Sequence, residues 1–142
     1  MIVPVIHPRS PRETMAGWVY LPRFVDKIRL HLAGKLHADY QDNFTKGFDA
    51  KWLAAAGVTA ERFIEVVRNS TTDGEICDWI IIHGVSAGES KAAFREHLLT
   101  HGKEDDPALR TRLKLRKEQA GLAHRDDILT FADFIDADEG RA

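Results

Sequence analysis

The sequence predicts an all-α fold: a compact single-domain multi-helix bundle of about seven helices with short loops, spanning residues 1–142. The length of 142 residues fits one domain, and signals for helix starts and stops recur along the chain. We find no period-two alternation of apolar and polar residues, which is the pattern of half-buried strands. Hydrophobic residues make up 44% of the chain and charged residues 30%, values that argue against a disordered chain or a disulfide scaffold.

Two helices are predicted in the first third of the chain. Residues 10–13, Ser-Pro-Arg-Glu, match a capping box and predict a short helix to about Met15 that Gly17 ends. Pro22 begins the next helix, which carries the clearest amphipathic stripe in the sequence. Its apolar positions are Leu21, Phe24, Val25, Ile28, Leu32 and Leu36.

The next part of the chain alternates a loop with two more helices. Residues 38–48 are predicted to form a loop. Asp49 is expected to cap a short helix through Ala56, which Gly57 closes in the left-handed conformation. Thr59 is expected to cap a further helix of about ten residues.

A second capping box, Thr-Asp-Gly-Glu at residues 72–75, introduces the apolar segment 76–83, with Gly84 as its stop. This segment is apolar nearly all round, which predicts a helix in the middle of the bundle. The β-branched run 80–82 leaves a buried strand as the alternative. The box and the closing glycine favour the helix.

Three further helices complete the predicted bundle. Residues 86–90 open a helix that runs to His101. Asp106 is expected to cap a basic helix over residues 107–119, with proline at its first position. Thr130 opens a final short helix.

Charge is unevenly distributed along a chain of net charge −2. Residues 1–38 carry six bases against two acids, and residues 107–125 carry six against one. Residues 39–106 carry seven bases against thirteen acids, and residues 126–139 carry six acids and no base. We expect these blocks to neutralise each other within the fold or across a dimer, with the acidic segment 126–142 docked on the domain. Because the chain as a whole is not basic, a nucleic-acid partner is not expected.

The single cysteine, Cys77, cannot form an internal disulfide and fits a reducing compartment. Residues 1–7 are too short and too uncharged for a signal peptide, and no run approaches the apolar length of a membrane helix. These features predict a cytoplasmic location and no membrane partner. Cys77 lies in the most apolar predicted helix, which favours core packing over a nucleophilic role.

Five segments of the sequence form a recognisable set: Pro8-Arg9-Ser10-Pro11-Arg12-Glu13, Leu21-Pro22-Arg23 with Asp26-Lys27, Gly34-Lys35-Leu36, the helix Thr72 to Ile80, and the ending from Phe131 to Arg141. Together these segments resemble the DUF5069 family. The likeness covers most of the chain and is weakest over residues 83–125. It implies a small bacterial protein of unknown function, and it carries over no catalytic residue.

The N-terminal part offers a candidate anion site. Arg23 and Lys27 share one helix face, where a like-charge pair costs about 0.2–0.5 kcal/mol unless something neutralises it. The ligand-binding residues predicted on this basis are Arg9, Arg12, Tyr20, Arg23, Lys27 and Tyr40. The alternative is that Asp26 and Glu13 pair with these arginines, so that the cluster is structural.

No metal site or cofactor is predicted. His97 and His101 are four residues apart and share one face of the expected helix, but zinc needs three or four ligands. The third ligand would have to be His83, Glu96 or Asp105, and an ordinary pair at a helix end is the favoured interpretation. Neither a Walker A sequence nor a Rossmann glycine motif is present.

Three functions remain open. The first is binding of an anionic small molecule or partner through the N-terminal basic cluster. The second is a homo-oligomeric interaction protein whose basic helix, residues 107–119, docks on the acidic tail; a flat patch holding Trp18 or Trp52 would favour it. The third is an enzyme that uses the same cluster, although no catalytic residue can be identified.

Overall fold

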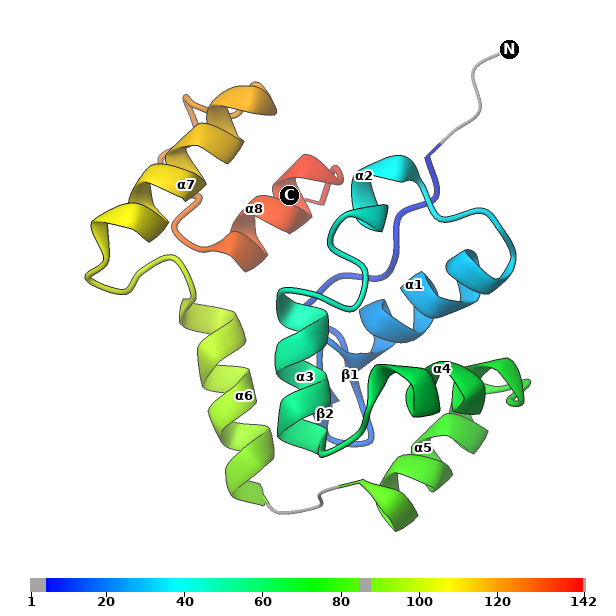
Figure 1. Ribbon diagram of the computed structural model, residues 1–142. Coiled ribbons are helices and arrows are strands. Elements are labelled where there is room, and N and C mark those ends of the chain that lie inside the picture. The colour runs from blue at the N-terminus through cyan, green and yellow to red at the C-terminus, as the bar shows by residue number, and fades with distance from the viewer. Residues whose placement is uncertain (1–4, 85–87, 142) are drawn as a thin grey trace.

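The computed structural model describes residues 5–84 and 88–141, which form eight helices and one two-stranded hairpin (Figure 1). The elements are β1 (Thr14–Met15), β2 (Trp18–Val19), α1 (Leu21–Leu32), α2 (Ala38–Gln41), α3 (Phe48–Ala56), α4 (Ala60–Arg68), α5 (Asp73–His83), α6 (Gly88–Thr100), α7 (Pro107–Gln119) and α8 (Phe131–Asp138). The predicted all-α class is confirmed. Within the described ranges, every helix is too short or too polar to cross a bilayer.

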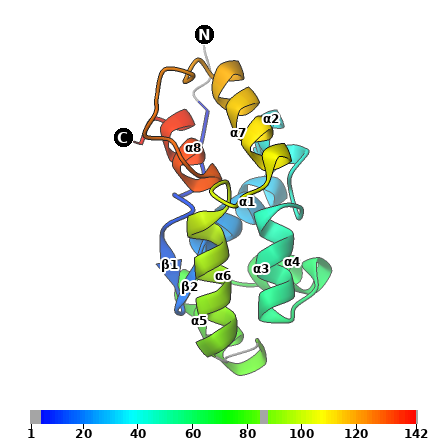
Figure 2. The same cartoon turned by 90° about the vertical axis from the view of Figure 1, so that its left-hand side faces the viewer.

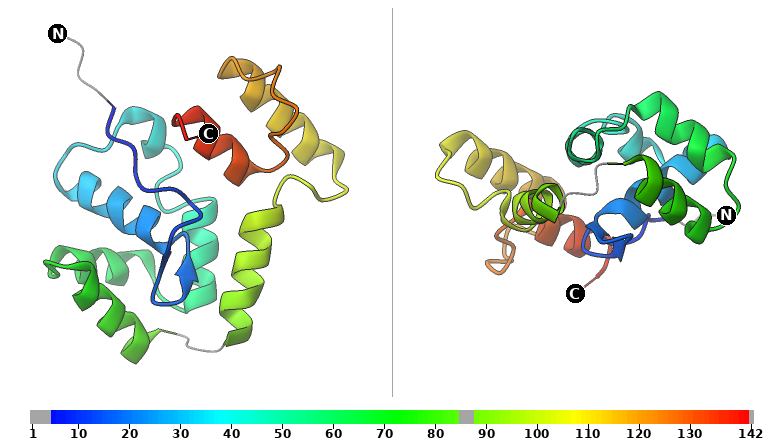
Figure 3. Two further views of the ribbon diagram at one scale, coloured as in Figure 1. Left: turned by 180° about the vertical axis from the view of Figure 1, so that it is seen from behind. Right: turned by 90° about the horizontal axis from the view of Figure 1, so that it is seen from below.

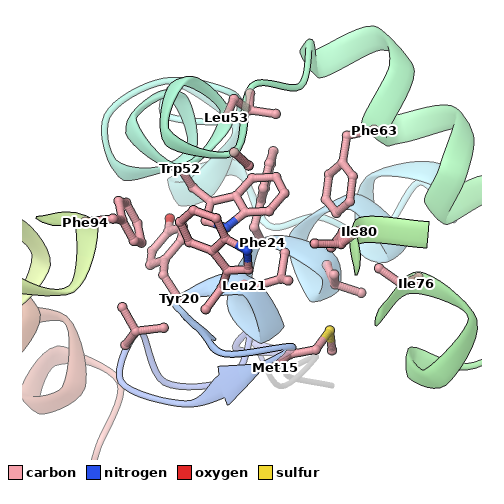
Figure 4. Packing of buried hydrophobic residues seen from close by; sticks show 14 of the residues in the cluster. Met15, Tyr20, Leu21, Phe24, Trp52, Leu53, Phe63, Ile76, Ile80 and Phe94 are labelled. Carbon is pink, nitrogen blue, oxygen red and sulfur yellow. The ribbon is translucent and has the colours of Figure 1, made fainter. Parts of the chain in front are cut away.

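The main core surrounds α1. Phe24 lies at its centre and packs against Trp52 of α3 and Phe63 of α4, with ring centroids 5.8 and 5.5 Å apart (Figure 4). Trp18 of β2 closes the core on the side of α6, where its ring meets Phe94 at 6.1 Å. All these side chains are buried, and the apolar stripe of α1 faces inward as its periodicity predicts.

The last two helices form a smaller unit beside this core. A second cluster joins Leu113 of α7 to Ile128 and Phe134. Figure 1 shows α8 between α7 and the part of the chain that carries α1 and α2, and Figure 2 shows α8 above the end of α6. Since α8 contacts both α6 and α7, it ties the basic helix to the rest of the domain.

The helix predicted from Ser10 to Met15 is wrong. The oxygens of Ser10 accept from the backbone N–H groups of Arg12 and Glu13, but the chain then turns into the β1–β2 hairpin instead of a helix. Its two-residue turn has Ala16 at φ 52° and Gly17 at φ 79°, the left-handed pair that hairpin turns require. The hairpin packs between α1 and α6 (Figure 3).

The region predicted as a loop over residues 38–48 contains the short helix α2. Asp49 does not cap α3, which begins one residue earlier. Gly57 closes that helix with φ 69°, as predicted. The predicted cap at Thr59 is confirmed, since its side chain accepts from the backbone N–H of Arg62.

The remaining caps also match the sequence. Thr72, Asp106 and Thr130 each accept from a backbone N–H in the first turn of the helix that follows. The helix α7 has the predicted bounds of 107–119. For α6 only the part from Gly88 can be compared, because Ser86 lies outside the described residues.

The apolar segment 76–83 is helical, so the strand alternative is wrong, but it does not lie in the middle of the bundle. Only one face of α5 is buried, through Ile76 and Ile80, and it packs against α4 at the edge of the domain. Ile81 and Ile82 are 60% and 73% exposed.

Ile80 and Ile82 differ in burial and therefore test which face of α5 packs against the domain. Ile80 is 3% exposed, so Ile80→Ala should lower the free energy of unfolding by about 2–5 kcal/mol. Ile82→Ala, two positions along the same helix, should change it by less than about 0.5 kcal/mol. Urea unfolding followed by circular dichroism measures both. Equal losses would show that α5 is packed by a different face.

Candidate functional site

A buried ion pair joins α1 to the end of α8. The Arg23 guanidinium donates to both oxygens of Glu139, at 2.6 and 2.9 Å, and each side chain is 4% exposed. Tyr40 donates its hydroxyl to the same carboxylate at 2.8 Å, and its ring lies under the Arg23 cation at 5.5 Å. Arg23 also donates to the carbonyl of Arg9. The two ends of the chain are therefore held to one helix face.

The electrostatics of this pair favour its charged form. Burial acts to raise the pKa of Glu139, but the hydrogen bonds and charge of Arg23, with hydrogen bonds from Tyr40 and Arg141, outweigh it and hold the pKa below the ordinary value. Burial and the hydrogen bond to Glu139 raise the pKa of Tyr40. The site therefore holds one carboxylate, the two guanidinium groups of Arg23 and Arg141, and one neutral phenol at neutral pH.

A second buried pair lies one turn further along α1. Lys27 donates to both oxygens of Asp49, at 2.9 and 3.1 Å, and Tyr20 donates to Asp49 at 2.5 Å. The backbone N–H of Thr45 also donates to Asp49, which is fully buried. Burial lowers the pKa of Lys27 although Asp49 opposes the change, and burial raises the pKa of Tyr20 well above its ordinary value.

Arg9 is held by two carboxylates, one from α1 and one from the start of α5. Its guanidinium donates to both oxygens of Asp26, at 3.0 and 3.1 Å, and to Asp73 at 3.0 Å. Arg29 donates to the other oxygen of Asp73 at 2.7 Å. The alternative pairing with Asp26 is therefore present for Arg9. Glu13 forms no ion pair with any described residue.

Arg12 is paired with the C-terminal helix. It donates to Asp136 at 2.6 Å and also to Asp133 of α8. The acidic tail thus directs three of its carboxylates, those of Asp133, Asp136 and Glu139, toward arginines of the N-terminal block.

The predicted anion-site residues are consequently brought together in part. Arg9, Arg23 and Tyr40 meet around one network, Tyr20 and Lys27 meet around Asp49, and Arg12 lies against α8. Every cation of the set faces a carboxylate of the chain itself. No local signal identifies Asp49, Asp73 and Glu139 as the partners, because they are 22, 64 and 116 residues away from the bases that they meet.

A different group of cations surrounds a groove of about 560 Å³ beside α7. Its floor is apolar, formed by Leu113, Ile128 and Leu129. Gly102 and Ala123 also line it, and four bases and one acid complete the lining: Lys103, Arg110, Lys114, Lys117 and Glu118. Among the described residues, Arg110 alone of these bases has a carboxylate at ion-pairing distance, the exposed Asp105 at 3.6 Å.

The predicted histidine pair gains a third group, Glu104. Ligand atoms of His97, His101 and Glu104 all lie within 4.8 Å of one another. Burial and the neighbouring His101 and Lys51 lower the pKa of His97. Burial acts to raise the pKa of Glu104, but hydrogen bonds from His101 and from the backbone, including the N–H of Gly102, together outweigh it and hold the pKa at about 2. Glu104 was not among the third ligands considered from the sequence, although the stop at Gly102 marks where the chain turns back.

Cys77 is half-buried on α5. Burial and the carboxylate of Asp73 raise the pKa of its thiol. A protonated thiol is a poor nucleophile, so its surroundings do not prepare it for covalent chemistry.

The fold and these sites define a small helical domain in which a buried ion pair joins α1 to the segment after α8 and which carries a cationic groove. The chain belongs to the DUF5069 family, described as a domain of unknown function, whose profile matches residues 6–141. No curated protein matches the chain.

The Lys27–Asp49 pair gives the first prediction for this region. Lys27→Met should lower the free energy of unfolding by about 3–5 kcal/mol, because it leaves a buried carboxylate without its counter-charge. Lys27→Met combined with Asp49→Asn should recover part of this loss. Lys35→Met, an exposed lysine just after α1, is the control and should change stability by less than about 0.5 kcal/mol. A loss below about 1 kcal/mol for Lys27→Met would mean that the ammonium is not enclosed.

The lowered pKa of Glu139 gives the second. An acid whose pKa is lower in the folded state adds stability above its unfolded value, and that stability is lost as the pH falls through the folded pKa. The free energy of unfolding should therefore fall below about pH 4.5, and less steeply in Glu139→Gln than in the wild type. Urea midpoints measured across this range test the difference. Glu61→Gln, on the exposed side of α4, should keep the wild-type slope, and the same slope in Glu139→Gln would contradict the prediction.

Proposed function

We propose that this chain binds a small organic anion that carries an apolar part, and that the groove beside α7 is where it binds. One observation carries the proposal: Lys103, Lys114 and Lys117 line an apolar floor without an ion-pairing partner among the described residues. A volume of about 560 Å³ is within the range of small-molecule sites. Charged groups at the rim would fix the anion, and the floor would hold the apolar part.

The distribution of acids supports this location. The tail was expected to neutralise the basic helix, but Asp133, Asp136 and Glu139 contact arginines of the N-terminal block instead. Arg110, Lys114 and Lys117 therefore follow one another at helical spacings of four and three with little compensation. Like charges at these spacings destabilise a helix by about 0.2–0.5 kcal/mol per pair, which a bound anion would relieve. Asp127, which is near enough to Lys117 to feel its charge, offsets only part of this.

The proposal keeps the ligand class expected from the sequence and changes its site. Arg23 and Lys27 are each 4% exposed, and their hydrogen bonds are directed at Glu139 and Asp49. An anion there would have to displace a carboxylate that is already bound. The α7 groove requires no such exchange.

The other two functions have less support. The homo-oligomer hypothesis looked for a surface holding Trp18 or Trp52, and both side chains are fully buried. The enzyme hypothesis relied on the N-terminal cluster, whose basic groups are already paired with carboxylates of the chain. A cytoplasmic location remains part of the proposal.

Matched probes test the groove. The wild-type protein is titrated by calorimetry with 1-naphthyl phosphate, with inorganic phosphate and with neutral 1-naphthol. We expect 1-naphthyl phosphate to bind most tightly, since it alone offers both charge and apolar surface. At one hundred times its Kd it should add about 2.7 kcal/mol to the free energy of unfolding, and added salt should weaken its binding.

Charge reversals on the two faces of α7 provide the control. Lys114→Glu with Lys117→Glu should weaken binding of 1-naphthyl phosphate by at least about tenfold, because each hydrogen bond to a charged group contributes about 1.5–3 kcal/mol. Arg112→Glu with Arg116→Glu makes the same change in net charge on residues that do not line the groove. Equal effects of the two double variants, or no binding by the wild type, would overturn the proposal. Sedimentation velocity on the same proteins shows whether self-association contributes.

A further inference from the structure

The end of α6 brings three metal-ligating side chains to one point. His97 and His101 follow each other by one helical turn, and their rings lie 4.8 Å apart at an interplanar angle of 35°. The helix stops at Thr100, and the chain turns back so that Glu104 faces His101, with Nδ1 and Oε1 3.0 Å apart. Two imidazoles and one carboxylate within 4.8 Å of one another form a donor set typical of zinc sites with three protein ligands.

The surrounding structure fixes this arrangement before any ion binds. The backbone N–H of Gly102 donates to Oε2 of Glu104 at 2.5 Å, which leaves Oε1 toward the imidazole. Gly102 has φ 113°, and a Cβ there would lie 3.1 Å from the Cα of Thr130. The turn that carries Glu104 therefore needs a glycine against α8.

Aromatic rings hold the two imidazoles. Phe48 of α3 meets both rings edge-on, at 5.9 and 5.7 Å, and Phe131 of α8 stacks on His101 at 5.1 Å. The backbone carbonyl of His101 accepts from the N–H of Phe131 at 2.9 Å. The three groups are thus fixed by contacts from α3, α6 and α8, as the outer contacts of a metal site fix its ligands.

The geometry points to a binding site for a divalent transition-metal ion of the zinc class, held by His97, His101 and Glu104. Tetrahedral ligands at about 2.0–2.1 Å from zinc lie about 3.3 Å from one another, and the ligand atoms here already lie within 4.8 Å of one another. Two imidazoles and one carboxylate leave room for water as a further ligand. The choice of nitrogen and carboxylate donors favours zinc, cobalt or nickel over calcium and magnesium. Lys51, whose charge reaches His97, opposes the cation and sets a limit on its affinity.

Zinc titration of protein without an affinity tag tests the site. Calorimetry with zinc chloride at pH 7 should show one equivalent bound, and the same amount of zinc should raise the melting temperature reversibly, with EDTA restoring the original value. Cobalt chloride should give the absorption bands of cobalt bound to nitrogen and oxygen ligands. These measurements need neither the groove ligand nor the proposed anion function.

Single variants then identify the ligands. His97→Gln and Glu104→Gln should each lower the affinity for zinc by at least about tenfold, while circular dichroism shows that the fold is kept. His37→Gln is the matched control, because His37 is 3.4 Å from Asp39 but belongs to no group of three ligands among the described residues; it should bind zinc as the wild type does. Lys114→Glu with Lys117→Glu should also retain zinc, which separates this site from the groove. Absence of wild-type binding, or unchanged binding in both His97→Gln and Glu104→Gln, would overturn the assignment.

Discussion

The buried pair between Arg23 and Glu139 is the contact on which the rest of the arrangement depends. It joins residues 116 positions apart and brings the end of α8 against the first turns of α1. Removing Glu139 would leave the buried Arg23 guanidinium without its counter-ion, a cost of several kcal/mol, whereas Glu139 without Arg23 would still face Arg141. Replacing both with apolar residues can be nearly neutral in other proteins, so the pair determines where the tail lies more than how stable the domain is.

That position of the tail decides the charge of the remaining surface. Acids of α8 that could have neutralised the neighbouring basic helix contact Arg12 and Arg23 instead. The contact between α7 and α8 is apolar, through Leu113 and Phe134. The basic helix α7 is therefore held by apolar contacts that do not neutralise its charge. Its basic side chains face solvent beside the apolar floor of the groove. The same ion pairs that occupy the N-terminal cluster leave α7 as the exposed cationic surface.

Local signals in the sequence predicted the helices well and the tertiary partners poorly. The caps at Thr59, Thr72 and Thr130 were predicted correctly because a hydroxyl and a backbone N–H two or three residues away decide them. Ser10 failed because its turn is followed by Ala16 and Gly17, whose left-handed backbone allows a hairpin that Trp18 fixes in the core. Asp49 is a residue type that often caps helices. Here it is instead a buried counter-ion, because Lys27 approaches it from another helix. Contacts of this kind between distant residues depend on how the helices pack, and the spacing of residues along the chain does not predict that packing.

Glu104 is the candidate-site residue that the sequence pattern did not predict. The helical spacing of His97 and His101 placed their rings on one face, but the third ligand depends on the direction of the chain after α6 ends. Gly102 decides that direction: its positive φ turns Glu104 back toward His101, and a Cβ at this position would lie 3.1 Å from the Cα of Thr130. Gly102 and Lys103 also line the groove beside α7. The proposed metal site and the cationic groove thus both include the turn that follows α6, and the start of α8 packs against this turn. The ion pair between Arg23 and Glu139 positions α8. Because α8 contacts both sites, this one pair helps to position them both.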